Sequence, residues 1–353
     1  CRCAGITGSV GKTTTKEMIA AVLRTAPRTQ WTEKNYNNEI GLPVSVLRLK
    51  PDCEAAVLEM GMNHFGELSV LTRIAQPDLA VITNIGTMHI ENLGSREGIL
   101  QAKLEILEGL RPGGRVIFNG DDALLRPLAA RYHAVCFGLS EGCDVRASRV
   151  CESAEGSKFT VHAFGKSFEA ALSVPGLHNV LDALAAAAVG LLLGLSPEQI
   201  AEGLRSYAPL RQRVSHAAGM TIIDDCYNAG PESMRAALRV LAGTPTEGRR
   251  IAVLGGMLEL GDFAPELHAG VGREAAKAAD LLLAYGPCSE CYVQGAHEAG
   301  LAGARAFATH DALVAALEET CRAGDTLLFK GSHGMHMEQV LARLLKTKEH
   351  MGE

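Results

Sequence analysis

The sequence predicts an α/β protein of two domains, each with a mostly parallel sheet whose strands alternate with helices. At 353 residues the chain exceeds the length at which a single hydrophobic core usually stops growing. Short apolar runs typical of strands alternate with segments of helical periodicity along most of the chain. This alternation favours parallel strands joined by right-handed helical crossovers.

The first domain is expected to span residues 1–209. Its predicted strands are 1–7, 55–60, 79–83 and 115–119, and its predicted helices are 12–23, 66–75 and 95–109. Between 143 and 174 short alternating runs turn at Gly156 and Gly165, which predicts antiparallel hairpins added to the sheet. A long Ala/Leu helix follows at 176–193, and Ser196-Pro197-Glu198 is typical of the start of another helix.

The second domain is expected to span residues 210–353. The segment 207–213 has little periodicity and contains Pro209, so the boundary is placed there. A second alternating series follows, with strands near 220–224, 250–254, 281–284 and 325–329 and helices near 231–242, 266–279, 310–322 and 335–346. This pattern predicts a second, smaller doubly wound, Rossmann-like domain.

Composition excludes several classes of protein. A net charge of −6 argues against a large nucleic-acid-binding surface, so no nucleic-acid partner is expected. The longest apolar run, 183–195, is too short to span a bilayer and fits a core helix, so no membrane insertion is expected. The ten cysteines form no disulfide-scaffold pattern, which favours reduced thiols and a cytoplasmic location. The protein is expected to be a monomer. Cys288-x-x-Cys291 lacks a second such pair and has Pro287 and Ser289 beside it, which favours thiols in a loop over a zinc or redox site.

The segment GSVGKT at 8–13, called the phosphate loop below, lies between the first predicted strand and the first predicted helix. This is the context that a phosphate-binding loop requires. Gly8 and Gly11 let backbone N–H groups turn inward, and the helix presents its positive end to the anion. Lys12 adds a positive charge for the terminal phosphates, and the Thr13 hydroxyl can ligate Mg²⁺.

The phosphate loop predicts nucleotide binding but does not name a reaction. The usual pattern has another glycine where this chain has Ile6. Switch GTPases, kinases, transporter ATPases and ligases all contain such loops. The sequence contains no NKxD-type segment of a GTPase and no signature loop of a transporter ATPase.

Four stretches together resemble the Mur ligase family, and the resemblance covers nearly the whole chain. They are TGSVGKTT at 7–14, LEMGMN at 58–63, TNIGTMHIE at 83–91 and GLHNVLDA at 176–183. The family does not require the early glycine, which accounts for Ile6. The last stretch departs from the family at Asp182, where Asn is usual. The implied architecture is a central P-loop ATPase domain with added hairpins, followed by the smaller Rossmann-like domain.

Three further stretches are similar to those of the family member that joins D-alanyl-D-alanine to UDP-N-acetylmuramoyl-tripeptide. They are TEKNYNNEIGLP at 32–43, DDCYNAGPESM at 224–234 and GMLELG at 256–261, with Gly230 where Asn is usual. The resemblance implies an ATP-dependent ligase of peptidoglycan precursor synthesis, acting through an acyl phosphate that the acceptor amine attacks. It also implies a preceding N-terminal domain that holds the uridine nucleotide. The third residue of the peptide, lysine or diaminopimelate, stays open.

The resemblance also implies which residues hold ATP and two Mg²⁺ ions. The phosphates would contact Gly8, Ser9, Gly11, Lys12, Thr13 and Thr14. Thr13 and Glu59 would ligate one Mg²⁺, and His89 a second. Lys103, in QAKLEI at 101–106, matches a lysine that most relatives carbamylate to support the metals. Carbamylation needs a neutral amine, so Lys103 would need a pKa lowered by burial or by a cationic neighbour. The implied catalytic set is Lys12, Glu59, His89 and Lys103.

Other residues are implied by the same resemblance. Asn179 would contact the nucleotide, Arg213 would reach the phosphates, with Arg211 a weaker candidate, and Asp225 would bind the ribose. The peptide substrates would contact Asn35, Asn37, Asn38, Tyr227, Asn228 and Ser233. KGSH at 330–333 resembles a turn of the family, and places Lys330 and Ser332 near the substrate.

Alternatives remain at two levels. Taken alone, Glu59 fits a solvent-facing strand end, His89 a polar loop residue, Lys103 an exposed helix lysine, Asn179 a helix N-cap, and the Asn-rich segment a turn. At the level of function, a folylpolyglutamate synthase or another peptide-adding ligase would share the loop, acid and histidine but lack the 32–43 and 224–234 stretches. A non-catalytic nucleotide-binding regulator would not need Glu59, His89 and Lys103 together.

Overall fold

The computed structural model describes residues 1–33, 35–153, 155–209 and 213–350. The chain divides into two compact units, Cys1–Ala208 and Pro209–Glu353, each described here by itself. Both units alternate strands with helices, so the α/β fold class predicted from the sequence is confirmed.

Unit 1 is built on a nine-stranded sheet in the order β2-β3-β1-β4-β5-β6-β7-β8-β9. The pairs from β2 to β7 are parallel, and β7-β8-β9 are antiparallel, as the hairpin pattern predicted. The strands are β1 Arg2–Thr7, β2 Thr29–Trp31, β3 Ala55–Glu59, β4 Leu79–Ile82, β5 Arg115–Asn119, β6 Val135–Gly138, β7 Val145–Ser153, β8 Gly156–Ala163 and β9 Lys166–Leu172.

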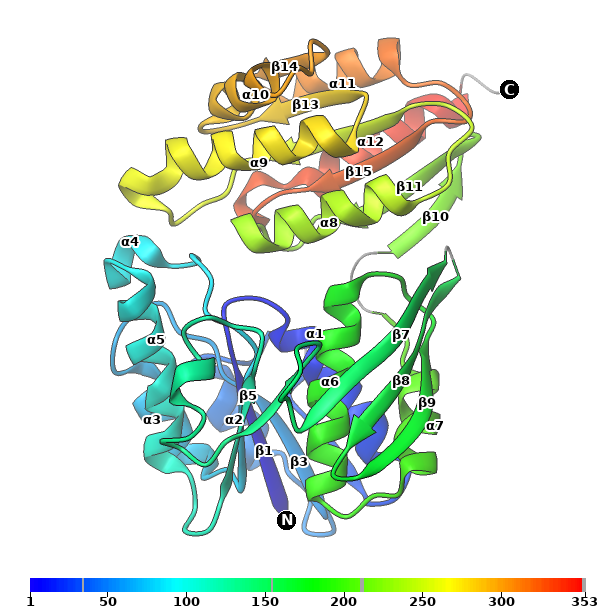
Figure 1. Cartoon of the computed structure of the whole chain (residues 1–353). Coiled ribbons are helices and arrows are strands. Elements are labelled where there is room, and N and C mark those ends of the chain that lie inside the picture. The colour runs from blue at the N-terminus through cyan, green and yellow to red at the C-terminus, as the bar shows by residue number, and fades with distance from the viewer. Residues whose placement is uncertain (34, 154, 210–212, 351–353) are drawn as a thin grey trace. The chain divides into compact units, whose positions relative to one another are not determined.

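Helices cover both faces of this sheet. Figure 1 shows α3 and α5 on one side and α1 and α6 on the other. The helices are α1 Lys12–Leu23, α2 Gly41–Leu47, α3 Glu67–Ala75, α4 Ile90–Leu93, α5 Arg96–Leu104, α6 Leu177–Leu192 and α7 Pro197–Ser206. Consecutive alanines at 185–188 on α6 are fully buried, and their small side chains let α6 pack closely in the main core with α1.

Local sequence sets where these helices begin. Ser196 caps α7 with a full capping box, in which the Ser196 hydroxyl accepts from the Gln199 N–H and the Gln199 side chain accepts from the Ser196 N–H. A serine also caps α5, where the Ser95 hydroxyl accepts from the Gly98 N–H. The helix predicted over 95–109 consists of two parts. Helix α5 ends at Leu104, and a 3₁₀ helix follows over Glu105–Gly109.

Unit 2 is a six-stranded sheet in the order β10-β11-β15-β12-β13-β14. Its pairs are parallel except the edge pair β10–β11. The strands are β10 Arg213–Ala217, β11 Met220–Asp225, β12 Arg250–Gly255, β13 Leu281–Tyr285, β14 Ala304–Phe307 and β15 Thr326–Lys330. The helices are α8 Pro231–Gly243, α9 Ala264–Ala278, α10 Ser289–Glu298, α11 His310–Thr320 and α12 Met337–His350, with α8 and α9 in front of the sheet in Figure 1 and α12 behind it.

The interpretation of Cys288-x-x-Cys291 as a loop is wrong for Cys291. Cys288 is the N-cap of α10 with φ 57°, and Cys291 lies within the helix. Gly295 of α10, at the contact with α9, makes this helix hard to recognise in the sequence. A Cβ on Gly272 would lie 2.0 Å from the Tyr292 carbonyl, and one on Gly295 would lie 2.0 Å from that of Ala269. The close approach of the two backbones requires glycine at positions where it weakens the helical signal.

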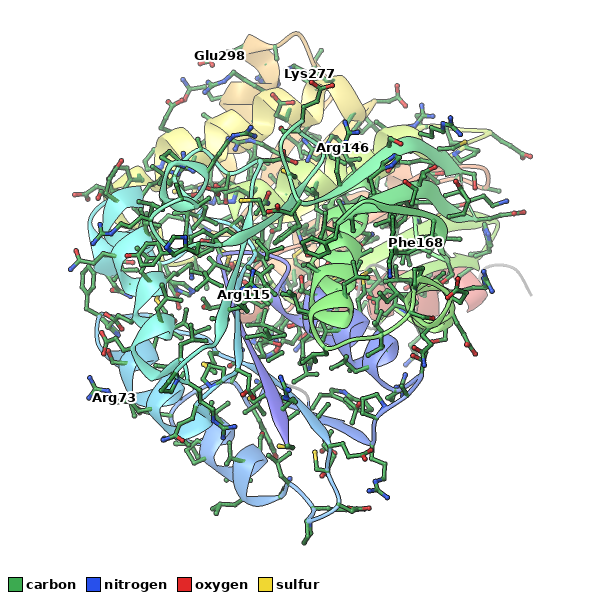
Figure 2. All side chains as sticks on the ribbon, turned by 60° about the horizontal axis from the view of Figure 1, so that its bottom comes forward. Arg73, Arg115, Arg146, Phe168, Lys277 and Glu298 are labelled. Atoms are coloured by element: carbon green, nitrogen blue, oxygen red, sulfur yellow. The ribbon has the colours of Figure 1, made fainter. Side chains whose placement is uncertain are left out.

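Many charged side chains lie on the outer faces of the helices. Figure 2 shows Arg73 of α3 and Glu298 of α10 projecting from the ribbon, and both are exposed. Arg73 pairs with Glu108 at 2.9 Å, an exposed pair that contributes little to stability. None of the helices within the described residues is long and apolar enough to cross a bilayer.

Candidate active site

The phosphate loop connects β1 to α1 and is held open by two glycines. Gly8 has φ 150° and Gly11 has φ 83°, and Gly11 is the N-cap of α1. A Cβ on Gly8 would lie 1.8 Å from Thr83 Oγ1, so this position also requires the absence of a side chain. The Lys12 ammonium donates to the carbonyls of Gly8 and Ser9 at 2.8 and 3.3 Å. The loop therefore curls around its own lysine at the start of a helix, the arrangement that binds phosphates.

The loop is anchored to the end of the neighbouring strand β4. The Asn84 side chain accepts from the Val10 N–H at 3.0 Å and donates to the Val10 carbonyl at 3.1 Å. Thr83 Oγ1 donates to the same carbonyl at 2.6 Å, and the Ser9 hydroxyl accepts from the Gly86 N–H at 2.9 Å. Sequence reasoning gave Thr83 and Asn84 no role beyond membership of a motif. Both residues directly follow a strand that neighbours β1, and this position was the sequence signal that they hold the loop.

Glu59, the last residue of β3, points its carboxylate at the loop. Glu59 Oε1 accepts from the Thr13 hydroxyl at 3.2 Å and from the Asn37 side-chain amide at 2.8 Å. The residue is 2% exposed, so its interpretation as a solvent-facing strand end is wrong. Within the described residues, Glu59 Oε2 is buried and has no hydrogen-bond donor. A buried carboxylate oxygen without a donor is costly unless a cation completes it.

Two buried elements position that carboxylate. Thr32 Oγ1 accepts from the Glu59 N–H at 3.0 Å. Lys16, on α1, is fully buried with its ammonium 3.9 Å from Glu59 Oε2. That ammonium instead donates to the Thr32 carbonyl at 2.7 Å and pairs with Glu17 at 2.9 Å. Sequence reasoning missed Lys16. The available signal was its position four residues after Lys12, about one helical turn further along α1.

His89 and Lys103 lie on the segments that follow β4. His89 is half-buried with φ 63° and is the N-cap of α4, so it is held by the local fold rather than in a free loop. Lys103 is 2% exposed near the end of α5, so its interpretation as an exposed helix lysine is wrong. Burial lowers the pKa of Lys103 well below its usual value, and the positive charge of Lys12 lowers it further. A lowered pKa favours the neutral amine, which is the form that carbamylation requires.

Asn179 lies in the first turn of α6, where the N-cap is Gly176, so its interpretation as the N-cap is wrong. It is buried, and its amide donates to the Pro175 carbonyl at 2.7 Å. Asn38 has a local role, because its side chain accepts from the N–H groups of Ile40 and Gly41 at the start of α2. Asn37 reaches Glu59, while Asn35 is exposed. The Asn-rich segment is thus partly a turn and partly a support for the carboxylate.

Unit 2 brings Asp225, Lys330 and Ser332 to the carboxyl ends of its strands or just beyond them. Lys330 ends β15 and pairs with Asp225, which ends β11, at 2.6 Å, and it donates to the Asn228 carbonyl at 3.0 Å. The Ser332 hydroxyl accepts from the Leu258 N–H at 3.0 Å. Lys330 and Ser332 therefore link the loops that follow three strands of this sheet.

Two of the predicted substrate residues in unit 2 also have local structural roles. The Ser233 hydroxyl donates to the Gly230 carbonyl at 3.0 Å and accepts from its N–H at 3.1 Å, which caps α8. Asn228 Oδ1 accepts from the Ala229 N–H. Tyr227 is 40% exposed, and its ring lies 5.9 Å from that of His333. Arg211 and the side chain of Arg213 lie outside the described part of the structure.

The donors gathered in unit 1 suit a hard cation that keeps other ligands. Among the residues that the structure describes, no three His, Cys, Asp or Glu side chains come together as a metal cluster. Mg²⁺ is usually held by one or two protein oxygens together with water and substrate phosphates. Glu59 Oε2 and the Thr13 hydroxyl, beside an anion-binding loop, provide such oxygens.

Comparison with known proteins agrees with this geometry. Residues 6–190 match the model of the Mur ligase middle domain, and residues 211–333 match that of the Mur ligase glutamate ligase domain. The chain belongs to the Mur ligase family. The part that matches the Mur ligase middle domain contains the phosphate loop, Glu59, His89, Lys103 and Asn179.

Individual Mur ligases are similar over nearly the whole chain. UDP-N-acetylmuramoyl-tripeptide--D-alanyl-D-alanine ligase of Bacillus subtilis is 40% identical over 98% of this chain and 76% of its own length. The crystal structure of MurF from Acinetobacter baumannii has a TM-score of 0.90 at 35% identity, covering 98% of this chain and 76% of that one. MurF ligase of Thermotoga maritima in complex with ADP has a TM-score of 0.88 at 30% identity, covering 99% and 81%.

Proposed function

We propose that this chain is an ATP-dependent ligase that joins D-alanyl-D-alanine to UDP-N-acetylmuramoyl-tripeptide in peptidoglycan precursor synthesis. The observation that carries the proposal is the buried Glu59 carboxylate, which has one oxygen without a donor and lies at the phosphate loop. The similarity to ligases of that name over 97% or more of the chain supports the choice of substrates.

Mg²⁺ fits the residues present at this site. Glu59 Oε2 lacks a donor within the described residues, and the Thr13 hydroxyl lies on the other oxygen of the same carboxylate. Glu59 and Thr13 would hold one ion and His89 a second. Bound Mg²⁺ would offset the negative charge of the phosphates and of the attacking carboxylate.

The chain's own residues then have distinct tasks. The N–H groups of the phosphate loop, from Gly8 to Thr14, bind the β- and γ-phosphates of ATP, and Lys12 exchanges its bonds to the loop carbonyls for bonds to phosphate oxygens. Lys16 and Thr32 keep Glu59 in place. Phosphoryl transfer to the peptide carboxylate gives an acyl phosphate and ADP. Attack by the D-alanine amine then forms the amide bond and releases phosphate.

Lys103 would act as a carbamate. A lowered pKa favours the neutral amine, the form that adds CO₂ with loss of one proton, and the resulting anion would support the metal ions. A carbamate is an oxygen donor, which Mg²⁺ prefers to an amine.

The remaining assignments follow the resemblance and the local geometry. Asn179, Asp225 and Arg213 would bind the nucleotide. Asn35, Asn37 and Asn38 would contact the peptide, and Tyr227, Asn228, Ser233, Lys330 and Ser332 would form the acceptor region. We place the reaction in the cytoplasm, because all ten cysteines are free thiols. The enzyme would act as a monomer.

The acceptor is tested by measuring ADP release from the purified full-length protein with ATP, Mg²⁺, UDP-N-acetylmuramoyl-tripeptide and a panel of amines. D-Alanyl-D-alanine should give rapid ADP release, and L-alanine, D-glutamate and L-glutamate should give none above background. Release with a glutamate acceptor but not with D-alanyl-D-alanine would show that the chain is a different ligase of the family. ATP binding without release for any acceptor would favour a non-catalytic regulator.

A further inference from the structure

A buried carboxyl group lies directly beneath the phosphate loop, and the mechanism above does not use it. Asp182, on α6, is 8% exposed. Its Oδ1 accepts from the Thr15 hydroxyl, in the first turn of α1, at 2.6 Å. A Cβ built on Gly11 would lie 2.7 Å from the same Oδ1, so the carboxyl packs against the backbone of the loop's last glycine.

The Thr15 hydrogen bond and the packing against Gly11 therefore place one carboxyl oxygen beside both ends of the anion-binding turn, residues 11–15. Gly11 is the N-cap of α1, and Thr15 donates its backbone N–H to the Gly11 carbonyl at 2.8 Å. The N–H groups that would face a phosphate belong to this same turn. Asp182 thus supports the turn from the side opposite to a bound phosphate.

The charged groups of α1 are directed away from this carboxyl. Lys12 donates to the carbonyls of Gly8 and Ser9, while Lys16 bonds Thr32 and Glu17. One turn earlier on α6 itself lies His178, which is half-buried.

The other elements packed against α6 place no buried charge toward Asp182. The ionisable side chains on β5 to β8 are Arg115, Cys136, Arg146, Arg149, Cys151, Glu152, Lys158 and His162. Those on α7 are Glu198, Glu202 and Arg205. Burial raises the pKa of Asp182 to about 7, the Thr15 hydrogen bond opposes that rise, and none of these ionisable groups contributes.

We propose that Asp182 is a positioning residue of the phosphate loop that binds a proton when a nucleotide polyphosphate occupies the loop. The inference rests on the nucleotide-binding function proposed above. A protonated carboxyl keeps the Thr15 contact and adds no charge behind the phosphates. An ionised carboxylate packed against Gly11 repels them through a buried, poorly screened path. Nucleotide binding and protonation of Asp182 therefore favour each other, as linkage requires.

The sign of the pH dependence follows from this linkage. Near pH 6 Asp182 is already protonated, and binding takes up no proton at this site. As pH rises through about 7, binding of the nucleotide draws a proton onto Asp182, and affinity falls. The loss of affinity is about tenfold for a bound-state pKa that is one unit higher.

The test is calorimetric titration of the whole protein with ADP and Mg²⁺ between about pH 6 and about pH 8, in pairs of buffers with different ionisation enthalpies. The wild-type protein should take up a proton on binding near pH 7 and bind ADP more weakly at high pH. Asp182→Asn, a neutral isostere that still accepts from Thr15, should lose that proton uptake and bind ADP at high pH more tightly than the wild type. Protonation of the nucleotide or of His178 persists in this variant and is removed by subtraction.

A second variant covers the case in which Asp182→Asn does not fold. Thr15→Val removes the donor to Asp182 with little change of shape, so the pH at which the proton is taken up should move upward. Equal proton uptake by the wild type and Asp182→Asn, or no shift in Thr15→Val, would overturn the inference. If neither the wild type nor the variants bind ADP, the nucleotide-binding function itself is wrong.

Discussion

Each unit of this protein buries a lysine beside the acidic residue that ends a strand, yet the two pairs differ. In unit 2 the Lys330 ammonium forms a direct ion pair with Asp225 at 2.6 Å, so that the two opposite charges compensate each other. In unit 1 the Lys16 ammonium stays 3.9 Å from Glu59 Oε2, because the Thr32 carbonyl and Glu17 hold it. Among the described residues Glu59 Oε2 then has no donor.

The difference separates a structural ion pair from a site prepared for a cation. Asp225–Lys330 is a closed pair that fastens loops after neighbouring strands, whereas Glu59 keeps a buried anionic oxygen that the protein alone does not satisfy. The two buried lysines of unit 1 show the same contrast between a matched and an unmatched charge. Lys16 is matched by an acid and a carbonyl, whereas the charge that shifts the pKa of Lys103 is that of another cation, Lys12.

The largest effect is expected from Glu59→Gln, which keeps the shape of the side chain and removes its charge. If the oxygen without a donor serves a cation, ADP release should fall about a thousandfold or more. Lys12→Ala should be similarly severe. Glu108→Gln, which changes an exposed acid in the same unit, serves as the control and should keep wild-type turnover. Unchanged turnover in Glu59→Gln, with the melting temperature preserved, would remove Glu59 from the reaction.

Breaking the closed pair should instead affect folding. Lys330→Met leaves the Asp225 carboxylate partly buried without its partner, at a cost of about 3 kcal/mol in the free energy of unfolding. Pairing it with Asp225→Asn should recover much of that loss. Lys277→Met breaks an exposed pair with Glu274 in the same unit and should leave stability unchanged within error. Denaturant titration of these proteins would contradict the comparison if Lys330→Met and Lys277→Met behaved alike.

Lys103 should carry a carbamate that Lys16 does not. After equilibration with ¹³C-bicarbonate, the wild-type protein should show a carbamate signal in its NMR spectrum, and Lys103→Arg should lose both the signal and activity, by about 100-fold. The signal should weaken as pH falls, because protonation of the lowered-pKa amine removes the form that reacts with CO₂. Lys166→Arg, at an exposed position, is the matched control. A signal that survives in Lys103→Arg would assign the carbamate to another amine.

The smallest effect concerns pH and unit 2. His268 is buried and neutral, with its Nε2 accepting from the Met257 N–H at 3.0 Å and its Nδ1 bonding the Ala264 carbonyl at 2.6 Å. Burial lowers its pKa from the usual 6.5, so its contribution is present above that value and is lost as pH falls through the folded pKa. Stability should decline below about pH 6.5 by at most about 1.4 kcal/mol per pH unit.

This decline should be weaker in His268→Gln. The exposed His297→Gln on α10 is the control and should retain the full slope. Chemical unfolding at several pH values measures both, and equal slopes in the wild type and His268→Gln would show that His268 does not link folding to pH.

Much of the fold followed from patterns along the chain. The span 12–23 predicted for the first helix is that of α1, and the hairpins at 143–174 are β7 to β9. Helix α10 did not follow, because Gly295 is selected by close packing against the Ala269 carbonyl rather than by local propensity. Strand β2 has only three residues, which is too short for alternation to be visible.

The sequence by itself determined the phosphate loop, the strand-end acid and the family, because these depend on residue types at fixed short spacings. Only the tertiary structure decided which of the buried charges are matched. Lys16, Thr32 and Glu59 come from three separate segments. Thr15 and Asp182 come from two, which are 167 positions apart. Electrostatic pairing depends on distances of a few ångströms between such segments, and these distances exist only once the sheet and its helices have packed.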